Sequence, residues 1–74
     1  IGAGVSYSWT TFNWPIDRPV LWYIVPTTTG GYVNLNVGYQ LEFISGVPKM
    51  TYHLNLENPS GTSVTYNILY AILN

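Results

Sequence analysis

Apolar and polar residues alternate with a period of two along most of the chain. From Tyr32 to Phe43 the odd positions are apolar and most even positions are polar, and from Met50 to Glu57 the even positions are apolar. Successive side chains of a β-strand point to opposite faces of its sheet, so both segments are predicted to be strands with one buried face. The first segment is either one long strand or two strands with a bend at Gly38. The apolar sets are Val33, Leu35, Val37, Tyr39, Leu41 and Phe43 in the first segment and Met50, Tyr52, Leu54 and Leu56 in the second.

Two further segments are apolar on both faces. Val20–Val25 is apolar throughout, and the second half of Thr62–Asn74 adds Leu69, Ala71 and Leu73 to a face that begins as polar. We expect the end of the latter segment to be covered on both sides. Two such strands carry more apolar surface than one sheet with a solvent-exposed face can bury, which predicts a second sheet, a closed barrel or a partner.

Turn-forming residues separate these segments. They gather in Pro26–Gly31, Ser45–Lys49 and Asn58–Gly61, and their spacing is typical of antiparallel hairpins. No stretch shows sustained helical periodicity. The run from Tyr52 to Tyr66 resembles the last hairpin of many secreted jelly-roll or immunoglobulin-like domains. We therefore predict a single all-β domain over residues 1–74, a small antiparallel β-sandwich of jelly-roll or immunoglobulin-like type with five to six strands.

The N-terminal segment is predicted to be a short strand behind a flexible end. Ile1–Gly4 is small and glycine-rich, and Val5–Trp9 alternates apolar residues with serines. A strand at a chain end can complete its own sheet or insert into a neighbouring molecule, and both alternatives stay open. Residues 1–9 are thus a candidate exchangeable strand. The candidate subunit-interface residues are Ile1, Val5, Tyr7 and Trp9.

Composition excludes several classes of partner. Of the 74 residues 7% are charged, and the formal net charge of −1 leaves no basic patch for a phosphate backbone, so we expect no nucleic-acid partner. The longest apolar run is far shorter than the roughly 20 residues of a transmembrane helix, so none is expected. A single His without Cys cannot build a structural zinc site, and neither a metal nor another cofactor is expected.

Chain length and surface composition both point to association. The core of a domain of this size rarely contributes more than about 3–5 kcal/mol to the free energy of unfolding. Disulfides, which stabilise many small domains, are excluded because the chain has no Cys. The polar residues are mainly Thr, Asn and Ser, which lose less by desolvation than ions do. We therefore expect a homo-oligomer or polymer, with a glycan as a second candidate partner.

The sequence offers little support for catalysis. His53 has Thr51 and Asn55 as its neighbours on the same face of the predicted strand, so it is expected to be an exposed imidazole that packs on cross-strand neighbours. The acidic residues lie in separate segments, and no nucleophile, phosphate-binding or metal-ligand motif is present. We do not expect an enzyme.

Two residues are candidates for recognition. Trp14 is predicted to lie on a loop, where a large aromatic ring is less easily buried. Arg18 follows it in an Asp-Arg-Pro turn, and Arg and Trp are enriched at interface hot spots. Aromatic rings with nearby Asn, Thr and Tyr also suit the stacking of a sugar. Protein contact and sugar binding therefore both remain open for this segment.

The favoured function is a structural subunit of an extracellular filament, pilus-like fibre or surface assembly, joined by β-strand addition through the N-terminal segment. The single methionine is Met50, so we expect that a signal or leader preceded Ile1 and that the protein is extracellular or at the cell surface. The alternatives are a small carbohydrate-binding module or lectin and a membrane-active pore-forming oligomer.

Overall fold

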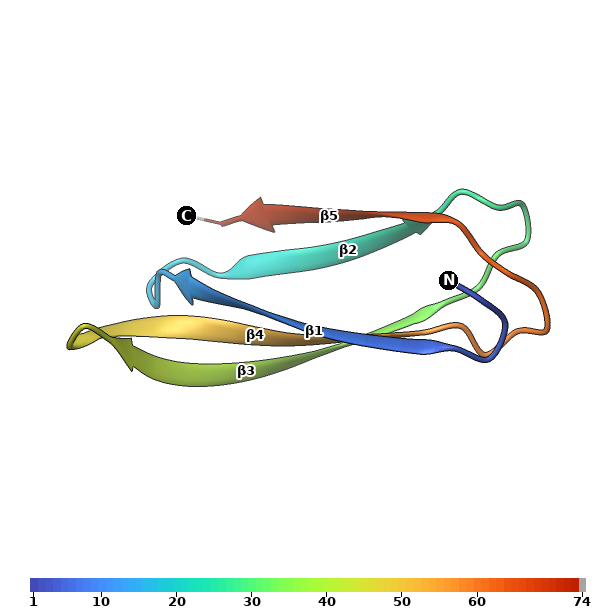
Figure 1. The fold of residues 1–74 in the computed structure, drawn as a ribbon. Helices are drawn as coiled ribbons and strands as arrows, with labels where there is room; N and C mark the ends of the chain where they lie inside the picture. Colours follow the sequence, from blue (N-terminus) through green and yellow to red (C-terminus); the bar gives the residue numbers. More distant parts are fainter. Residues whose placement is uncertain (74) are drawn as a thin grey trace.

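A computed structural model describes residues 1–73, which form five antiparallel strands in two sheets (Figure 1). Within these residues there is no helix, so the predicted all-β class is confirmed. The three-stranded sheet has the order β1-β4-β3, and the two-stranded sheet pairs β2 with β5. The strands are β1 (Ser6–Trp14), β2 (Val20–Pro26), β3 (Asn34–Ile44), β4 (Val47–Glu57) and β5 (Tyr66–Ile72).

Strands β3 and β4 form one long hairpin. All eleven residues of β3 pair with β4, so β3 is a single strand and Gly38 makes no break. The turn consists of Ser45 and Gly46, which have φ values of 52° and 77°. Two consecutive residues with positive φ are typical of a type I′ turn, whose twist matches that of the flanking strands. The predicted turn at Ser45–Lys49 is therefore shorter than expected, because β4 already begins at Val47.

The end of β1 carries a β-bulge that changes the position of a tryptophan. Thr11 pairs with Tyr52 and Trp14 pairs with Met50, so three steps along β1 match two steps along β4. Asn13 has a φ of 71°, a left-handed conformation that Asn tolerates better than most residues. The extra residue turns Trp14 to the face that Thr11 and Tyr52 share. The prediction that Trp14 lies on a loop is wrong, because β1 extends to it.

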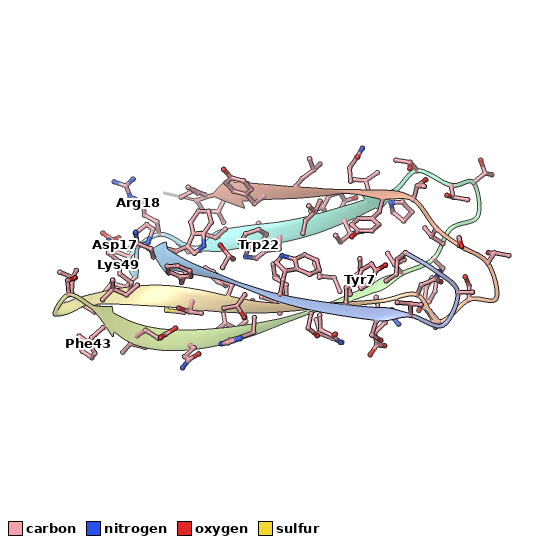
Figure 2. The ribbon with its side chains drawn as sticks, in the orientation of Figure 1. Tyr7, Asp17, Arg18, Trp22, Phe43 and Lys49 are labelled. Atoms are coloured by element: carbon pink, nitrogen blue, oxygen red, sulfur yellow. The ribbon has the colours of Figure 1, made fainter. Side chains whose placement is uncertain are left out.

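The core lies between the two sheets. Tyr52, Leu54 and Leu56 of β4 point toward β2 and β5 and are 3%, 1% and 0% exposed. Tyr7 of β1 and Trp22 of β2 also point into the space between the layers (Figure 2). The alternation predicted for β4 is confirmed from Tyr52 to Leu56, where the even residues are the buried ones, but the odd-numbered Thr51 is buried as well.

An aromatic cluster joins the two layers. Trp14 packs edge-on against Trp22 and Tyr70, with ring centroids 5.7 Å and 5.5 Å apart. Trp22 also contacts Tyr52, which in turn contacts Tyr39. Such edge-to-face pairs contribute about 0.5–1.5 kcal/mol each beyond the area they bury. Contact between the sheets therefore depends heavily on these rings.

The N-terminal segment is tied down by hydrogen bonds rather than free. The backbone of Gly4 donates to Asn58, and Asn58 donates to Val5, at 2.9 Å and 3.0 Å. Ile1 and Val64 exchange two more hydrogen bonds through their backbone groups. The side-chain amide nitrogen of the buried Asn58 also lies within 3.2 Å of the carbonyl oxygens of residues 1, 2 and 62. The expected flexible end is thus an ordered part of the fold.

The molecule is a thin plate with Cα extents of 45 × 22 × 13 Å. Its radius of gyration is 14.4 Å, against about 11 Å for a compact chain of this length. The β3–β4 hairpin extends past the end of the two-stranded layer (Figure 1). A plate two sheets thick, with one layer narrower than the other, leaves much of its apolar surface uncovered.

Strand β5 departs most from expectation. The second half of Thr62–Asn74 was predicted to be covered on both sides, yet every residue from Asn67 to Leu73 is exposed. The reason is topological: residues 1–73 form only two sheets, so no layer covers the outer face of β5, and β5 pairs only with β2 and has no partner strand at its other edge. The apolar residues of this strand are present as predicted, but this chain alone does not cover them.

Candidate interaction surface

Large apolar side chains are more often exposed than buried in this domain. Within residues 1–73 the buried apolar residues are Val20, Tyr52, Leu54, Leu56 and Val64. The exposed ones are Val5, Tyr7, Phe12, Ile16, Leu21, Tyr23, Tyr32, Tyr39, Leu41, Phe43, Val47, Ile68, Leu69, Tyr70, Ile72 and Leu73. Single exposed apolar residues are normal, but contiguous groups of them mark interaction sites. The groups lie in two places.

The first group covers the outer face of the two-stranded sheet. Leu21 pairs with Ala71 and Tyr23 pairs with Leu69, so these four side chains stand together on the face turned away from β4. Leu21, Tyr23 and Leu69 are 56%, 63% and 51% exposed. They line a shallow apolar hollow of about 450 Å³. We call this group the outer apolar face.

The second group lies on the protruding hairpin. Tyr39, Leu41 and Phe43 follow one another on the same face of β3, and Tyr39 and Phe43 are both 70% exposed. Figure 2 shows Phe43 at the end of the molecule that the two-stranded layer does not reach. The two-stranded sheet would have to be longer to cover these rings. We call this group the hairpin apolar face.

Arg18 lies beside the hairpin apolar face. The link between β1 and β2 places Arg18 and Ile16 with Tyr39 and Met50 around a hollow of about 260 Å³. Arg18 is exposed and projects from the plate (Figure 2). An Arg at the rim of an apolar hollow fits the composition of an interface. Its proposed role in recognition stays a prediction.

Trp14 does not share that exposure. Its ring is half-buried among Trp22, Tyr52 and Tyr70, and its indole nitrogen donates a hydrogen bond of 3.0 Å to the hydroxyl of Thr11. A ring that packs on three others and has its N–H satisfied has a clear packing role in the core. Trp14 and Arg18 therefore lie in different environments, although they are four residues apart in the sequence.

The candidate interface residues of the N-terminal segment divide between edge and core. Trp9 and Tyr7 stand opposite Leu54 and Leu56 on the inner face of β1, where Trp9 is half-buried and Tyr7 is 47% exposed. Val5 is exposed, and Ile1 is half-buried next to Val64. In this structure β1 completes the sheet of its own chain.

The outer face of the three-stranded sheet is polar and hydrogen-bonded. The two ring nitrogens of His53 lie 3.2 Å from the hydroxyl of Thr10 and 2.6 Å from the side-chain oxygen of Gln40. Ser8 donates to the side chain of Asn55 one row further along. These contacts confirm that His53 is exposed and packs on its cross-strand neighbours. Side chains that form hydrogen bonds with one another in this way stabilise a solvent-exposed face.

Two buried polar atoms have no hydrogen-bond partner among the described residues. They are the indole nitrogen of Trp22, inside the aromatic cluster, and the hydroxyl of Thr51 on β4. Sequence reasoning missed both, because alternation placed Thr51 on the polar face and gave no sign that it is only 1% exposed. No group of three acidic, His or Cys side chains able to hold a metal occurs within residues 1–73.

Comparison with known proteins adds no relative. No protein-family model matches the chain, and no curated protein or solved structure is significantly similar to it. In the part of the chain that the structure describes, no helix is long and apolar enough to cross a membrane. The exposed surfaces of the domain are therefore the features that indicate its function.

Proposed function

We propose that the chain is a structural subunit of an extracellular filament, pilus-like fibre or surface assembly. The observation that carries the proposal is the excess of exposed over buried large apolar side chains in a plate only 13 Å thick. Burying apolar surface contributes roughly 25 cal/mol per Å², so covering it by neighbouring copies would stabilise a domain whose own core is small. The chain carries almost no charge that would oppose close approach of copies.

Assembly would also complete the architecture. We propose that the subunit is an incomplete β-sandwich of jelly-roll or immunoglobulin-like type, in which a neighbour covers what the two-stranded sheet leaves open. The hairpin apolar face supports this, because its side chains share a face of the three-stranded sheet with the buried Tyr52 and are nevertheless exposed. In an assembled sandwich these rings would lie between two sheets, as Tyr52 does within one subunit.

The N-terminal strand is the proposed joint between subunits. Strand β1 is at an edge and pairs only with β4, so an exchanged β1 would make the same contacts on the β4 of a neighbour. The link to β2 runs from Pro15 to Pro19, and a short link stiffened by proline favours exchange over folding back. Because β1 extends to Trp14, the exchanged segment would be residues 1–14 rather than 1–9. Repeated exchange in one direction would yield a fibre.

Deletion of residues 1–9 tests this joint. Light scattering and negative-stain electron microscopy of the intact chain are expected to show fibres, and the deleted chain is expected to form no fibres and to be less stable. A synthetic peptide of residues 1–9, the segment that the deletion removes, should bind the deleted chain, whereas the same peptide with Trp9→Asp should not, because Trp9 faces Leu54. Intact fibres after the deletion would contradict joining through this strand.

A carbohydrate-binding module is the second candidate function. The supporting observation is the outer face of the three-stranded sheet, where uncharged polar side chains surround a hollow of about 320 Å³. Hydroxyl and amide groups of this kind hydrogen-bond to sugars. A glycan array tests this candidate, and the substitution Asn55→Ala should remove any signal without affecting assembly, since Asn55 lies on the polar face.

A further inference from the structure

We propose that the free edge of β5 pairs antiparallel with β5 of a second copy of this chain, making a continuous four-stranded sheet from two two-stranded sheets. The inference rests on the proposed function, because it supplies a second joint, distinct from β1, through which strands of subunits associate side by side.

The unpaired backbone groups of β5 can be identified from the hydrogen bonds at its two ends. Leu73 donates to Pro19 and Thr65 accepts from Thr27, so the backbone groups of these two odd-numbered residues face β2. Because backbone groups of successive residues in a strand point to opposite edges, residues 67, 69 and 71 also face β2. The N–H and C=O groups of residues 66, 68, 70 and 72 therefore point to the free edge, where another strand can bind them.

Strand β5 has none of the features that protect edge strands from pairing. Such edges are usually protected by charged side chains, proline, a bulge or short length. Of the other strands with a free edge, β1 has the bulge at Asn13, β2 ends at Pro26, and β3 contains Gly38 and Glu42. Strand β5 reads YNILYAI over seven residues and pairs with β2 in a regular register. Strand β5 is therefore the edge strand least protected against pairing with another strand.

Pairing of the two β5 edges would also extend an apolar surface that is free of charge. The exposed apolar side chains on β5 and next to it on β2 are Leu21, Tyr23, Ile68, Leu69, Tyr70, Ile72 and Leu73. Edge pairing covers the parts of the β5 side chains that lie along the free edge and joins the rest into one larger apolar surface, so the contact itself depends mainly on backbone hydrogen bonds of the even-numbered residues. Strands β2 and β5 carry no charged residue, so two copies meet without like-charge repulsion. A two-stranded sheet is also only marginally stable by itself, and added strands stabilise it.

The alternation of the free groups fixes the symmetry of the contact. In an antiparallel pair of identical strands, residues that face each other are both even or both odd, so one residue must stand opposite its own copy. Pairing along the whole of β5 places the centre at Leu69. Leu69 then faces Leu69 of the second copy in a pair without direct hydrogen bonds, where Cα atoms are about 4.5 Å apart. Asn67 faces Ala71 of the second copy, and the outer apolar faces of the two copies become one surface.

Single-cysteine cross-linking tests this register, since the native chain contains no cysteine. Under mild oxidation the Leu69→Cys protein is expected to form a disulfide-linked dimer in most of its molecules. The matched control is Asn67→Cys, an exposed position on the same face of the same strand. Its two copies would be about 13 Å apart, beyond the roughly 7 Å that a disulfide spans, so cross-linking should stay at background. Combining Asn67→Cys with Ala71→Cys should restore it.

The outcomes separate this inference from the proposed function. Fibres with selective cross-linking at residue 69 support both. Fibres that cross-link equally at residues 67 and 69, or at neither, overturn the β5 contact and leave the structural subunit intact. Discrete dimers that cross-link at residue 69 support the β5 contact and overturn the filament. A native chain that stays monomeric at high concentration, with no cross-link, overturns both.

Discussion

Trp14 and Trp22 pack edge to face, with ring centroids 5.7 Å apart and planes at 90°, and this pair joins the two sheets. Trp14 comes from the end of β1 and Trp22 from the middle of β2, so the short link between these strands crosses from one sheet to the other. The contact explains how so thin a plate holds together. It also makes the aromatic cluster the part of the fold most sensitive to substitution.

Truncating this contact should destabilise the domain. Trp→Ala in a full core costs about 3–5 kcal/mol, and for the half-buried Trp14 we expect about 2–3 kcal/mol, a large part of the stability of a small domain. Trp14→Phe keeps a ring in place and should cost about 1 kcal/mol. Urea denaturation followed by tryptophan fluorescence measures both. Unchanged stability of Trp14→Ala together with loss of glycan binding would instead support a lectin.

The bulge in β1 should distinguish between small residues at position 13. Asn13 has a φ of 71°, which glycine adopts freely and alanine does not. Asn13→Ala is therefore expected to lower the free energy of unfolding by about 1 kcal/mol, whereas Asn13→Gly should be nearly neutral. Equal stability of the two variants in urea would contradict the left-handed conformation at this residue.

Asn58 should control the order of the N-terminal segment. Its side-chain amide nitrogen faces three carbonyl oxygens, and its side-chain oxygen accepts hydrogen bonds from the backbone and the hydroxyl of Ser60. Asn58→Ala removes the hydrogen bonds that this side chain makes to the three carbonyls and to Ser60, each worth about 0.5–1.5 kcal/mol, and should cost about 2–3 kcal/mol in total. Hydrogen exchange is expected to become faster at Gly4 and Val64, whose N–H groups bond within this network. Unchanged exchange at both would show that Asn58 does not hold the segment.

A charge on β5 should weaken assembly without unfolding the subunit. Leu69 is half exposed, so Leu69→Lys should change the stability of the monomer by less than about 0.5 kcal/mol. In the proposed sheet the two lysines would stand opposite each other, and their repulsion should raise the concentration needed for assembly, less so at high salt. Asn36→Lys, an exposed position on β3, is the control and should assemble normally. Equal assembly of both variants would contradict the β5 contact.

The sequence predicted where the strands lie better than it predicted which of their side chains are covered. Alternation placed Tyr52, Leu54 and Leu56 correctly on the buried face of β4, because a period of two is a local property of the strand. Trp14 was expected on a loop, but β1 extends to it, and a bulge that has no signature in the sequence turns its ring to the inner face. The exposure of β5 could not be predicted, because whether an apolar strand is covered depends on which other strands the chain provides.

The same limit applies to the candidate surfaces. The hairpin apolar face follows from the alternation in β3, but its exposure follows from the smaller extent of the two-stranded layer. The partnerless N–H of Trp22 depends on three-dimensional packing and has no signature in the sequence. Low charge and many aromatic residues predict an associating protein, because composition determines which surfaces can be covered by a partner, and association stays a prediction.

The particle size of the native chain tests the central proposal most directly. Light scattering over a dilution series, followed by negative-stain electron microscopy, should show long regular fibres that persist on dilution. A monodisperse particle of 8.3 kDa at all concentrations would contradict the proposal that this chain is a self-assembling structural subunit.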